Sequence, residues 1–241
     1  MMKLFLPQAP NESAITLGRE YRKRLTKVMR LKAGDTLQVF APGRRCECRI
    51  SSVQPEEVLL EIIRELPQPR RPDLHLILAQ CIPKGDRFDW LIQKATELGI
   101  AEIIPLISER TVVKPAHVEG KIQRWNEISE QAAGQSENAF PALIHSPRSL
   151  DSFLQSDFSA HLKLLLHERL QSDSLKSIVR GHTGHSIIFI VGPEGGWTDL
   201  ETERLAAADF RKVHLGPRIL RSETAGLVLA ALLQYELGDL S

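Results

Sequence analysis

The chain has 241 residues, of which 42% are hydrophobic and 25% charged, so it can build one large domain or two smaller ones around a buried core. The longest apolar run, 225–233, is about half the ~20 residues that a membrane helix needs, and Pro7 cuts the first apolar stretch short of a signal peptide. Both features favour a cytoplasmic protein. The three cysteines are too few for a disulfide framework or a complete zinc site, so reduced thiols are expected at Cys46, Cys48 and Cys81.

Positive charge is concentrated near the start of the chain, although the formal net charge is only +1. Residues 1–72 hold 14 Lys and Arg against 8 Asp and Glu, whereas the remainder holds 17 against 22. Most of the excess lies in 19–32, which has seven basic residues and one acidic residue. This distribution favours an anionic partner for the first part of the chain, but a solvated helix face would explain the same run.

The first 70 residues are expected to form a small β-rich unit. Short strands are predicted around Leu4–Leu6 and at 36–41, 45–53 and 57–65, separated by Gly and Pro turns. The basic segment 19–31 is expected to be a helix packed on them. Three prolines in 66–73 then indicate a linker.

After the linker the pattern changes to alternating strands and helices, which predicts a second domain over 74–241. Such alternation is typical of an α/β fold with a mostly parallel sheet covered on both faces. The expected strands are 74–81, 102–107, 161–166, 186–191 and 212–215, and the expected helices are 86–98, 118–136, 171–180, 198–208 and 222–238.

Two glycine-proline breaks each separate a predicted strand from a predicted helix. In "HSIIFIVGPEGGWTDLE" (185–201), the strand ends at Val191, and Thr198 with Glu201 has the form of a capping box. In 213–236 the break is Gly216-Pro217, and Ser222 is placed as the N-cap. If the two strands are neighbours, both breaks wall one cleft where glycine lets a flat ligand approach the main chain; tight turns alone would explain the spacing equally well.

The sequence lacks the common motifs for phosphate, dinucleotide and zinc binding and for a catalytic serine. The glycines of 192–196 lack the Lys-Ser/Thr of a phosphate loop and the spacing and position of a Rossmann fingerprint. The stretch His167–Gln171 lacks the second histidine of a zinc helix, and there is no G-x-S-x-G nucleophile elbow. Neither a metal nor a covalent nucleophile is expected. On spacing alone, Lys84 and Arg87 are ordinary surface residues beside an apolar helix stripe.

Five motifs occur in an order that closely resembles the bacterial 16S ribosomal RNA (uridine N3) methyltransferases of the SPOUT superfamily. They are "KVMRLKAGD" (27–35), "KGDRFDWLIQKATELG" (84–99), "SERTVVK" (108–114), "VGPEGGW" (191–197) and "LGPRILRSETA" (215–225). The resemblance covers nearly the whole chain. It implies an N-terminal PUA-like β-barrel for RNA binding over 1–70, and a SPOUT methyltransferase domain with a C-terminal trefoil knot over 74–241.

The resemblance further implies that the knot loops bind S-adenosylmethionine and that the enzyme is a homodimer. Carried onto this chain, the loops are Leu166-His167, Val191–Gly196, Leu215-Gly216 and Ile219–Ala225. The implied cofactor-binding residues are Leu166, His167, Val191, Gly192, Pro193, Glu194, Gly195, Gly196, Leu215, Gly216, Ile219, Leu220, Arg221, Thr224 and Ala225.

Methylation at uridine N3 is helped by two kinds of side chain, a cation and a proton acceptor. As the N3 proton leaves, negative charge spreads onto the flanking carbonyl oxygens, which a fixed cation can stabilise while a carboxylate takes the proton. Arg221 is the expected cation, with Arg218 second. Glu194 or Glu223 is the expected base, although Glu223 also suits the start of a helix through the helix dipole.

The implied partner is 16S rRNA or the small ribosomal subunit, in which the target base must be unpaired or flipped to be reached. A phosphate-binding surface is expected at Arg22, Lys23, Arg24, Lys27 and Arg30, extended by Lys84 and Arg87.

Two departures from the family pattern concern substrate contacts. The usual Glu-Gln-Ser-x-Arg reads "GQSEN" from Gly134 to Asn138, and Arg24 stands where a histidine usually precedes Leu25. The changes at 134 and 138 keep one alternative open, a SPOUT methyltransferase acting on another RNA. A second alternative is a non-catalytic RNA-binding assembly module that kept the fold.

Overall fold

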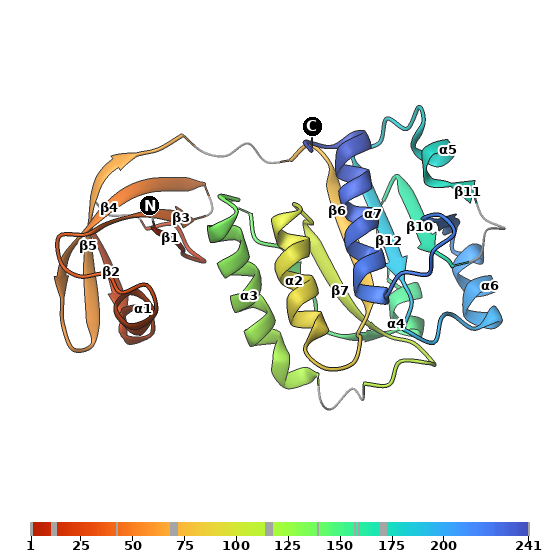
Figure 1. Ribbon diagram of the computed structural model, residues 1–241, viewed down its shortest axis with the longest axis horizontal. Helices are drawn as coiled ribbons and strands as arrows, with labels where there is room; N and C mark the ends of the chain where they lie inside the picture. Colours follow the sequence, from red (N-terminus) through yellow and green to blue (C-terminus); the bar gives the residue numbers. More distant parts are fainter. Residues whose placement is uncertain are drawn as a thin grey trace. The chain divides into compact units, whose positions relative to one another are not determined.

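The computed structural model describes residues 2–10, 14–41, 43–67, 72–113, 118–138, 140–156, 158, 160–168 and 173–240. The chain divides into two units, and Figure 1 labels the larger of their elements. The first unit comprises Met1–Arg71 and Ala133–Phe140, and the second comprises Pro72–Ala132 and Pro141–Ser241. A single cut at residues 70–74 therefore does not separate the two units, because Ala133–Phe140 belongs to the first.

The first unit is built on a five-stranded sheet with the order β1-β3-β4-β5-β2. β1 pairs with β3 in parallel, and the other neighbours are antiparallel. The strands expected at 36–41, 45–53 and 57–65 are confirmed, whereas β2 was not predicted. The bounds are Met2–Phe5 (β1), Ala14–Gly18 (β2), Thr36–Ala41 (β3), Arg44–Val53 (β4) and Glu57–Glu65 (β5).

The basic segment packs on this sheet through the buried Leu25, with the partly buried Tyr21 and Met29 beside it. It consists of Arg19–Lys23 (α1) and a π-helical turn, Arg24–Val28 (η1), and places Leu25 in the core formed by the sheet. The helix predicted over 19–31 thus ends three residues early. Arg30 adopts a φ of 56°, in the left-handed region, so the right-handed helix cannot continue through it.

Cys46 and Cys48 lie on the same face of β4, as their alternation in the strand predicted. Both are buried in the core of the first unit, and their sulfur atoms are 3.5 Å apart. All three cysteines are free thiols, which agrees with the expectation for a reduced protein.

The segment that departs from the family pattern is built into the first unit. Lys3 Nζ donates to the backbone oxygen of Gln135 at 3.1 Å and forms an ion pair with Glu137 at 3.0 Å. Arg45 contacts the same carboxylate at 3.1 Å. A Cβ at Gly134 would lie 3.5 Å from the backbone nitrogen of Phe5, so residue 134 packs directly against β1. The Asn138 side-chain oxygen accepts from the backbone N–H of Phe140 at 3.0 Å.

The second unit contains a sheet in which every pairing is parallel, as the alternation of strands and helices predicted. Its order is β11-β13-β10-β12-β6-β7-β8, with β9 also pairing with β7. All five predicted strands are present; the three two-residue strands were not predicted. The bounds are His75–Cys81 (β6), Glu102–Ile107 (β7), Leu143–Ile144 (β8), Arg148–Ser149 (β9), Leu162–Leu166 (β10), Asp173–Ser174 (β11), Ser186–Val191 (β12) and Arg211–His214 (β13).

The helices agree with the predicted pattern except around residue 171. There the described helix is only Leu175–Val179 (α5), because 173–174 pairs with β13 and the Ser174 hydroxyl caps the helix by accepting from the Ser177 N–H. Residues 171–172 lie outside the described part of the chain. The other helices are Arg87–Glu97 (α2), Glu119–Lys121 (η3, a 3₁₀ turn), Ile122–Gln135 (α3), the unpredicted Leu150–Leu154 (α4), Asp199–Ala207 (α6) and Ser222–Leu237 (α7). None of the described helices is long and apolar enough to cross a membrane.

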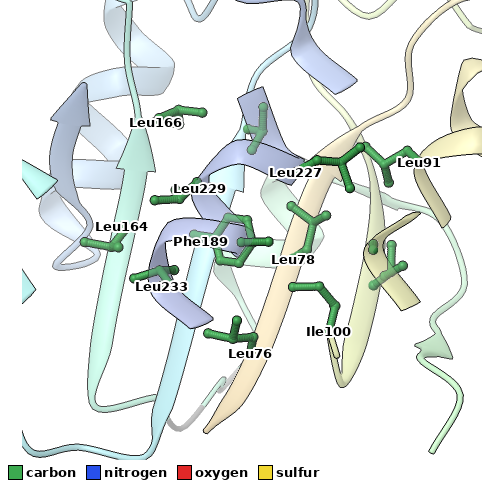
Figure 2. Close-up of a cluster of buried hydrophobic side chains, with 14 of the residues drawn as sticks. Leu76, Leu78, Leu91, Ile100, Leu164, Leu166, Phe189, Leu227, Leu229 and Leu233 are labelled. Carbon is green, nitrogen blue, oxygen red and sulfur yellow. The ribbon is translucent and has the colours of Figure 1, made fainter. Parts of the chain in front are cut away.

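Both faces of the parallel sheet are covered, because alternate residues of each buried strand enter different cores. Leu76 and Leu78 of β6 and Phe189 of β12 lie in a core with side chains of α2, α3, α5 and α7. Ile77 and Ile188 point the other way, into a core with α4 and α6. Figure 2 shows side chains of α7 meeting those of β6, β10 and β12 in the first of these cores. Together the two cores fix the positions of the strands and therefore of the loops at their carboxyl ends.

At the amino edge of this sheet, Glu102 binds two histidines. Its two carboxylate oxygens lie 2.8 Å from His75 Nε2 and 2.6 Å from His145 Nε2. Burial alone would raise the pKa of Glu102, but the hydrogen bonds with His145 and His75 outweigh it and hold the pKa below its ordinary value of 4.5.

We therefore expect Glu102 to stabilise the fold above pH 4.5 and to lose that contribution as the pH falls through the lower pKa of the folded state. The free energy of unfolding of Glu102→Gln should be below that of the parent at pH 7, and the difference should shrink towards pH 3. Denaturant titrations across this pH range measure it, with the exposed Glu61→Gln as control. A difference that stays constant with pH would contradict the assignment.

Candidate functional site

The carboxyl ends of three parallel strands, β10, β12 and β13, open into one cavity of about 350 Å³ in the second unit. The segments that contain both glycine-proline breaks line this cavity, so they do meet as the sequence predicted. Among the predicted cofactor-binding residues, all but Thr224 are in the lining. The full lining is Arg110, Leu166, His167, Glu168, Val191, Gly192, Pro193, Glu194, Gly195, Gly196, Trp197, Asp199, Leu215, Gly216, Arg218, Ile219, Leu220, Arg221, Ser222 and Ala225.

The two breaks do not follow neighbouring strands, which corrects the simplest interpretation of the sequence. β10 lies between β12 and β13 and pairs with both. The backbone N–H of His167 continues this pairing by donating to Val213 O at 2.9 Å. The end of β10 thereby supplies a third wall, through Leu166, His167 and Glu168.

The first break is shaped by close packing of an indole ring. A Cβ at Gly192 would lie 2.9 Å from Trp197 Nε1, closer than real side-chain contacts allow. Glycine at 192 therefore lets the ring of Trp197 cover the turn. The following helix α6 begins with the predicted capping box, since Thr198 and Glu201 exchange side-chain and backbone hydrogen bonds.

The second break depends on the left-handed conformation of Gly216, which has a φ of +99°. The Gly216 N–H donates to His214 Nδ1 at 3.1 Å, which closes the turn over the end of β13. The predicted N-cap role of Ser222 is wrong: Arg221 occupies the N-cap position and Ser222 is the first helical residue of α7.

The Ser222 hydroxyl instead connects the second break to the first. It donates to the backbone oxygen of Gly192 and accepts from Gln80 Nε2 at 2.7 Å. Gln80 is fully buried in β6, and a Cβ at Gly226 would lie 2.7 Å from its Oε1. The glycine at 226 therefore leaves room for a buried polar link that ties both turns to the sheet.

Removing this hydroxyl should destabilise the second unit. Ser222→Ala leaves the Gln80 amide and the Gly192 carbonyl without their shared partner, and an unpaired buried polar group costs about 1–3 kcal/mol. Denaturant unfolding followed by circular dichroism measures the loss. The exposed Ser152→Ala is the matched control, and a loss for Ser222→Ala no larger than for this control would contradict the role of the link.

The two predicted carboxylates occupy different positions relative to the cavity. Glu194 lines it, and its Oε1 accepts from the backbone N–H of Lys84 at 3.2 Å and from Arg87 Nη1 at 3.4 Å. Glu223 is outside the lining, with its side chain only 7% exposed. Arg87 Nε lies 3.7 Å from Glu223 Oε1, so this arginine bridges the first break and the start of α7. The structure thus brings Glu194, but not Glu223 or Thr224, to the cavity.

Three arginines line the cavity, of which the sequence singled out two. Arg218 and Arg221 are exposed on the second break, and Arg110 comes from the loop after β7. Arg110 lies in the motif "SERTVVK", which contributed to the family resemblance but predicted no role for this arginine. Lys114 of that motif lies outside the described residues. Glu168, Trp197 and Asp199 were missed as well. Trp197 and Asp199 directly follow the first break in the sequence, whereas only the folded chain places Glu168 beside it. Within the described ranges, no group of three or more His, Cys, Asp or Glu side chains could hold a metal ion.

The predicted phosphate-binding residues of the first unit lie on α1, η1 and just beyond. Lys23, Lys27 and Arg30 are exposed, whereas Arg22 and Arg24 are half-buried. Arg22 Nε donates to Gln54 O at 2.8 Å. The remaining two, Lys84 and Arg87, belong to the second unit and are exposed beside Glu194.

Known proteins resemble this chain over nearly its whole length. The family model described as an RNA methyltransferase domain matches residues 70–234. A ribosomal RNA small subunit methyltransferase E from Bacillus subtilis is 34% identical over 221 residues, covering 88% of this chain and 86% of that protein. Its counterpart from Synechocystis is 34% identical over 232 residues, covering 93% of this chain and 74% of that protein.

Solved structures agree with the sequence relatives. A protein from Legionella pneumophila, in complex with the bound cofactor SAM, has a TM-score of 0.91 at 31% identity, and the match covers 99% of each chain. A ribosomal RNA small subunit methyltransferase E from Neisseria gonorrhoeae, bound to S-adenosyl methionine, has a TM-score of 0.89 at 31% identity, and the match covers 100% of each chain. The chain therefore belongs to the RNA methyltransferase domain family, in its group of ribosomal RNA small subunit methyltransferases E.

Proposed function

We propose that the protein methylates N3 of a uridine in 16S ribosomal RNA, with S-adenosylmethionine as methyl donor. The observation that carries the proposal is the cavity at the carboxyl edge of β10, β12 and β13, where three loops meet in a chain of this family. Ligands of open α/β sheets bind at such edges. The Legionella and Neisseria structures have S-adenosylmethionine bound.

The residues present fit this cofactor. The cavity volume of about 350 Å³ lies in the ~300–1,000 Å³ range of small-molecule sites. Glycines at 192, 195, 196 and 216 leave main chain in the lining, where a side chain would otherwise stand. Trp197 Nε1 is buried without a hydrogen-bond partner among the described residues, so this donor is available to a ligand or water acceptor if the ring adjusts. The loops Leu166–Glu168, Val191–Trp197 and Leu215–Ala225 would hold the group.

The chain's own side chains then serve the reaction at N3. When bound, S-adenosylmethionine supplies an electrophilic methyl group on its sulfonium. Arg221, exposed at the N-cap of α7 and in the cavity lining, stabilises the negative charge that develops on the uracil oxygens. Glu194 takes the N3 proton: Lys84 and Arg87 hold its Oε1, while its Oε2 makes no hydrogen bond to the described residues.

RNA recognition is divided in the proposal between the two units. The first unit, as a PUA-like barrel over about residues 1–70, binds phosphates through Lys23, Lys27 and Arg30 with help from Arg22 and Arg24. Its mixed five-stranded sheet, which has a hydrophobic core of its own, supports this assignment. Lys84 and Arg87 contribute from the second unit. The target uridine is unpaired or flipped, because its Watson–Crick edge is hidden in a duplex. The reaction takes place in the cytoplasm, where ribosomal subunits are assembled.

The proposal includes a trefoil knot and a homodimer in the second unit, over 74–241. Supporting the knot, α7 returns from the β13 side to pack on β6 and β12, and it also contacts α5, which belongs to the connection between β10 and β12. Supporting the homodimer, Leu200, Ile219 and Tyr235 are exposed apolar side chains that a second copy could cover. Light scattering coupled to size exclusion measures the oligomeric state.

Primer extension across 16S rRNA from a strain lacking the gene tests the function. An N3-methyl group blocks base pairing and stops the polymerase, so the stop should disappear in the deletion strain and return with the plasmid-borne gene. A stop that persists without the gene would overturn the assignment to this RNA. The departures at Gly134 and Asn138 do not favour another substrate, because both residues have packing roles within the first unit.

A calorimetric titration with S-adenosylmethionine tests the cofactor independently of the substrate. Saturable binding at one site per chain is expected. RNA binding with no detectable cofactor binding would instead identify a non-catalytic RNA-binding module.

A further inference from the structure

The loop that follows β7 is built to hold one conformation. Its first residue, Ser108, and its last, Thr111, are joined by three hydrogen bonds. The backbone N–H of Ser108 donates to Thr111 Oγ1 at 3.0 Å, the N–H of Thr111 donates to Ser108 O at 3.1 Å, and the two hydroxyl groups lie 2.9 Å apart. The two residues between them, Glu109 and Arg110, therefore project from a closed turn.

A buried carboxylate attaches this loop to the helix that follows the first glycine-proline break. Glu201 of α6 is 5% exposed, and its Oε1 accepts from the backbone N–H of Glu109 at 2.9 Å. Its Oε2 accepts from the Thr198 N–H at 2.9 Å as part of the capping box. One side chain thus sets the position of the loop relative to the cavity wall.

Arg110 is the residue that this arrangement presents to the cavity. Its Nη1 donates to the backbone oxygen of Gly195 at 2.9 Å, and its guanidinium belongs to the lining. A Cβ at Gly195 would lie 3.4 Å from Arg110 Cβ, so the glycine leaves space for the arginine stem to cross the turn. The hydrogen bond to Gly195 therefore holds the guanidinium beside the first break, and Arg110 forms no ion pair with the described residues.

The cofactor alone does not account for the arginines of the cavity. S-adenosylmethionine has one carboxylate and two cationic groups, the sulfonium and the ammonium, whereas Arg110, Arg218 and Arg221 all line the cavity. None of the three makes an ion pair with the described residues, and the lining carboxylate of Glu194 already faces Arg87. The other lining acids, Glu168 and Asp199, suit the cofactor's ammonium and hydroxyl groups. An RNA strand brings a phosphate with every nucleotide, and the planar guanidinium matches phosphate geometry.

We propose that Arg110 binds a backbone phosphate of the RNA beside the target uridine, at the mouth of the cofactor cavity. The inference rests on the proposed function and extends it, since it assigns the "SERT" loop to substrate binding. Arg110 is a phosphate-binding residue that fixes the strand where the base enters the cavity. The hydrogen bond to Gly195 holds the guanidinium in place, and its remaining N–H groups contact the phosphate.

The test compares Arg110→Ala with the parent protein in two binding measurements. Anisotropy titrations with a labelled 16S rRNA fragment at several salt concentrations should show about tenfold weaker binding, with the slope of log K against log[salt] shallower by about 0.7–1. Calorimetry with S-adenosylmethionine should give a dissociation constant within about twofold of the parent. Arg180→Ala, at an exposed arginine outside the cavity, is the matched control and should change neither quantity.

Arg110→Lys separates the effect of the positive charge from that of the planar guanidinium geometry. It also provides a second test of the proposal if the alanine variant folds poorly. The lysine variant should keep the parent salt slope while binding RNA less tightly than the parent. The ammonium group keeps the positive charge but cannot form the two parallel hydrogen bonds of a planar guanidinium. Weaker cofactor binding with an unchanged RNA salt slope would overturn the proposal, as would a lysine variant with the slope of alanine. A failure of the proposed function itself would look different, since the unmodified protein would then bind no S-adenosylmethionine.

Discussion

Replacing Arg221 with alanine should lower kcat for RNA methylation by about 100-fold or more, with little change in the affinity for S-adenosylmethionine. The negative charge on the uracil oxygens develops only as the N3 proton leaves, so a cation that stabilises it acts on the transition state rather than on the bound cofactor. Arg221 is exposed and makes no ion pair with the described residues, so its removal leaves no buried partner unsatisfied. Single-turnover methylation with labelled cofactor measures the effect, and the thermal midpoint checks the fold.

Arg218→Ala is the informative comparison, because Arg218 is exposed on the same break and lines the same cavity. If Arg221 is the cation at the reacting base, kcat should fall much less in Arg218→Ala than in Arg221→Ala. Arg221→Lys should recover part of the rate, since it restores the charge without the planar fork. Unchanged turnover for Arg221→Ala would remove this residue from the mechanism, and a larger loss at Arg218 would exchange the two assignments.

Gly192→Ala should weaken S-adenosylmethionine binding by about 10–100-fold. The new methyl group would lie 2.9 Å from Trp197 Nε1 and 3.0 Å from Cε2, so the indole ring or the turn has to move. Both belong to the cavity lining, so either movement changes its shape. Overpacking of this kind costs about 1–3 kcal/mol, and each 1.4 kcal/mol is a tenfold change in affinity. Isothermal titration calorimetry with the cofactor measures the dissociation constant.

Gly120→Ala is the matched control for this substitution. Gly120 lies in the 3₁₀ turn before α3, has no positive φ, and a Cβ there would meet nothing within 4 Å. The same chemical change should therefore leave cofactor affinity unaltered and stability equal or slightly higher. Equal cofactor affinity in the Gly192→Ala and parent proteins would show that the turn at 192 does not shape the binding site.

The positions of the two predicted carboxylates refine the chemistry expected at N3. The resemblance left Glu194 and Glu223 as alternatives for the proton acceptor. Only Glu194 lines the cavity, while Glu223 is buried at the start of α7. Arg87, which the sequence placed on the RNA-binding surface, lies 3.4 Å from Glu194 and 3.7 Å from Glu223. It therefore orients the proposed base as well as adding positive charge near the cavity.

Local chemistry in the sequence determined most elements of this fold. The apolar runs of β6, β10 and β12 mark strands buried on both faces, because their apolar residues enter one core or the other. The capping box at Thr198 and the breaks at 192–196 and 216–217 depend on neighbours within a few residues, so their interpretation needed no tertiary information. The same breaks carried the family resemblance and, with it, the cofactor loops.

Tertiary structure decided how these pieces meet. The placement of β10 between β12 and β13 makes Leu166–Glu168 a wall of the cavity, and parallel pairing across long connections is not encoded in any short segment. Arg110 is held at the cavity by its hydrogen bond to Gly195, 85 residues away, and by the bond from the neighbouring Glu109 to the buried Glu201, 92 residues away. Ser222 has a sequence suited to an N-cap, but its hydroxyl binds Gly192 and Gln80 because these long-range partners are buried beside it. Such contacts form only when the sheet brings distant loops to one edge, which is why the site had to be found in the folded chain.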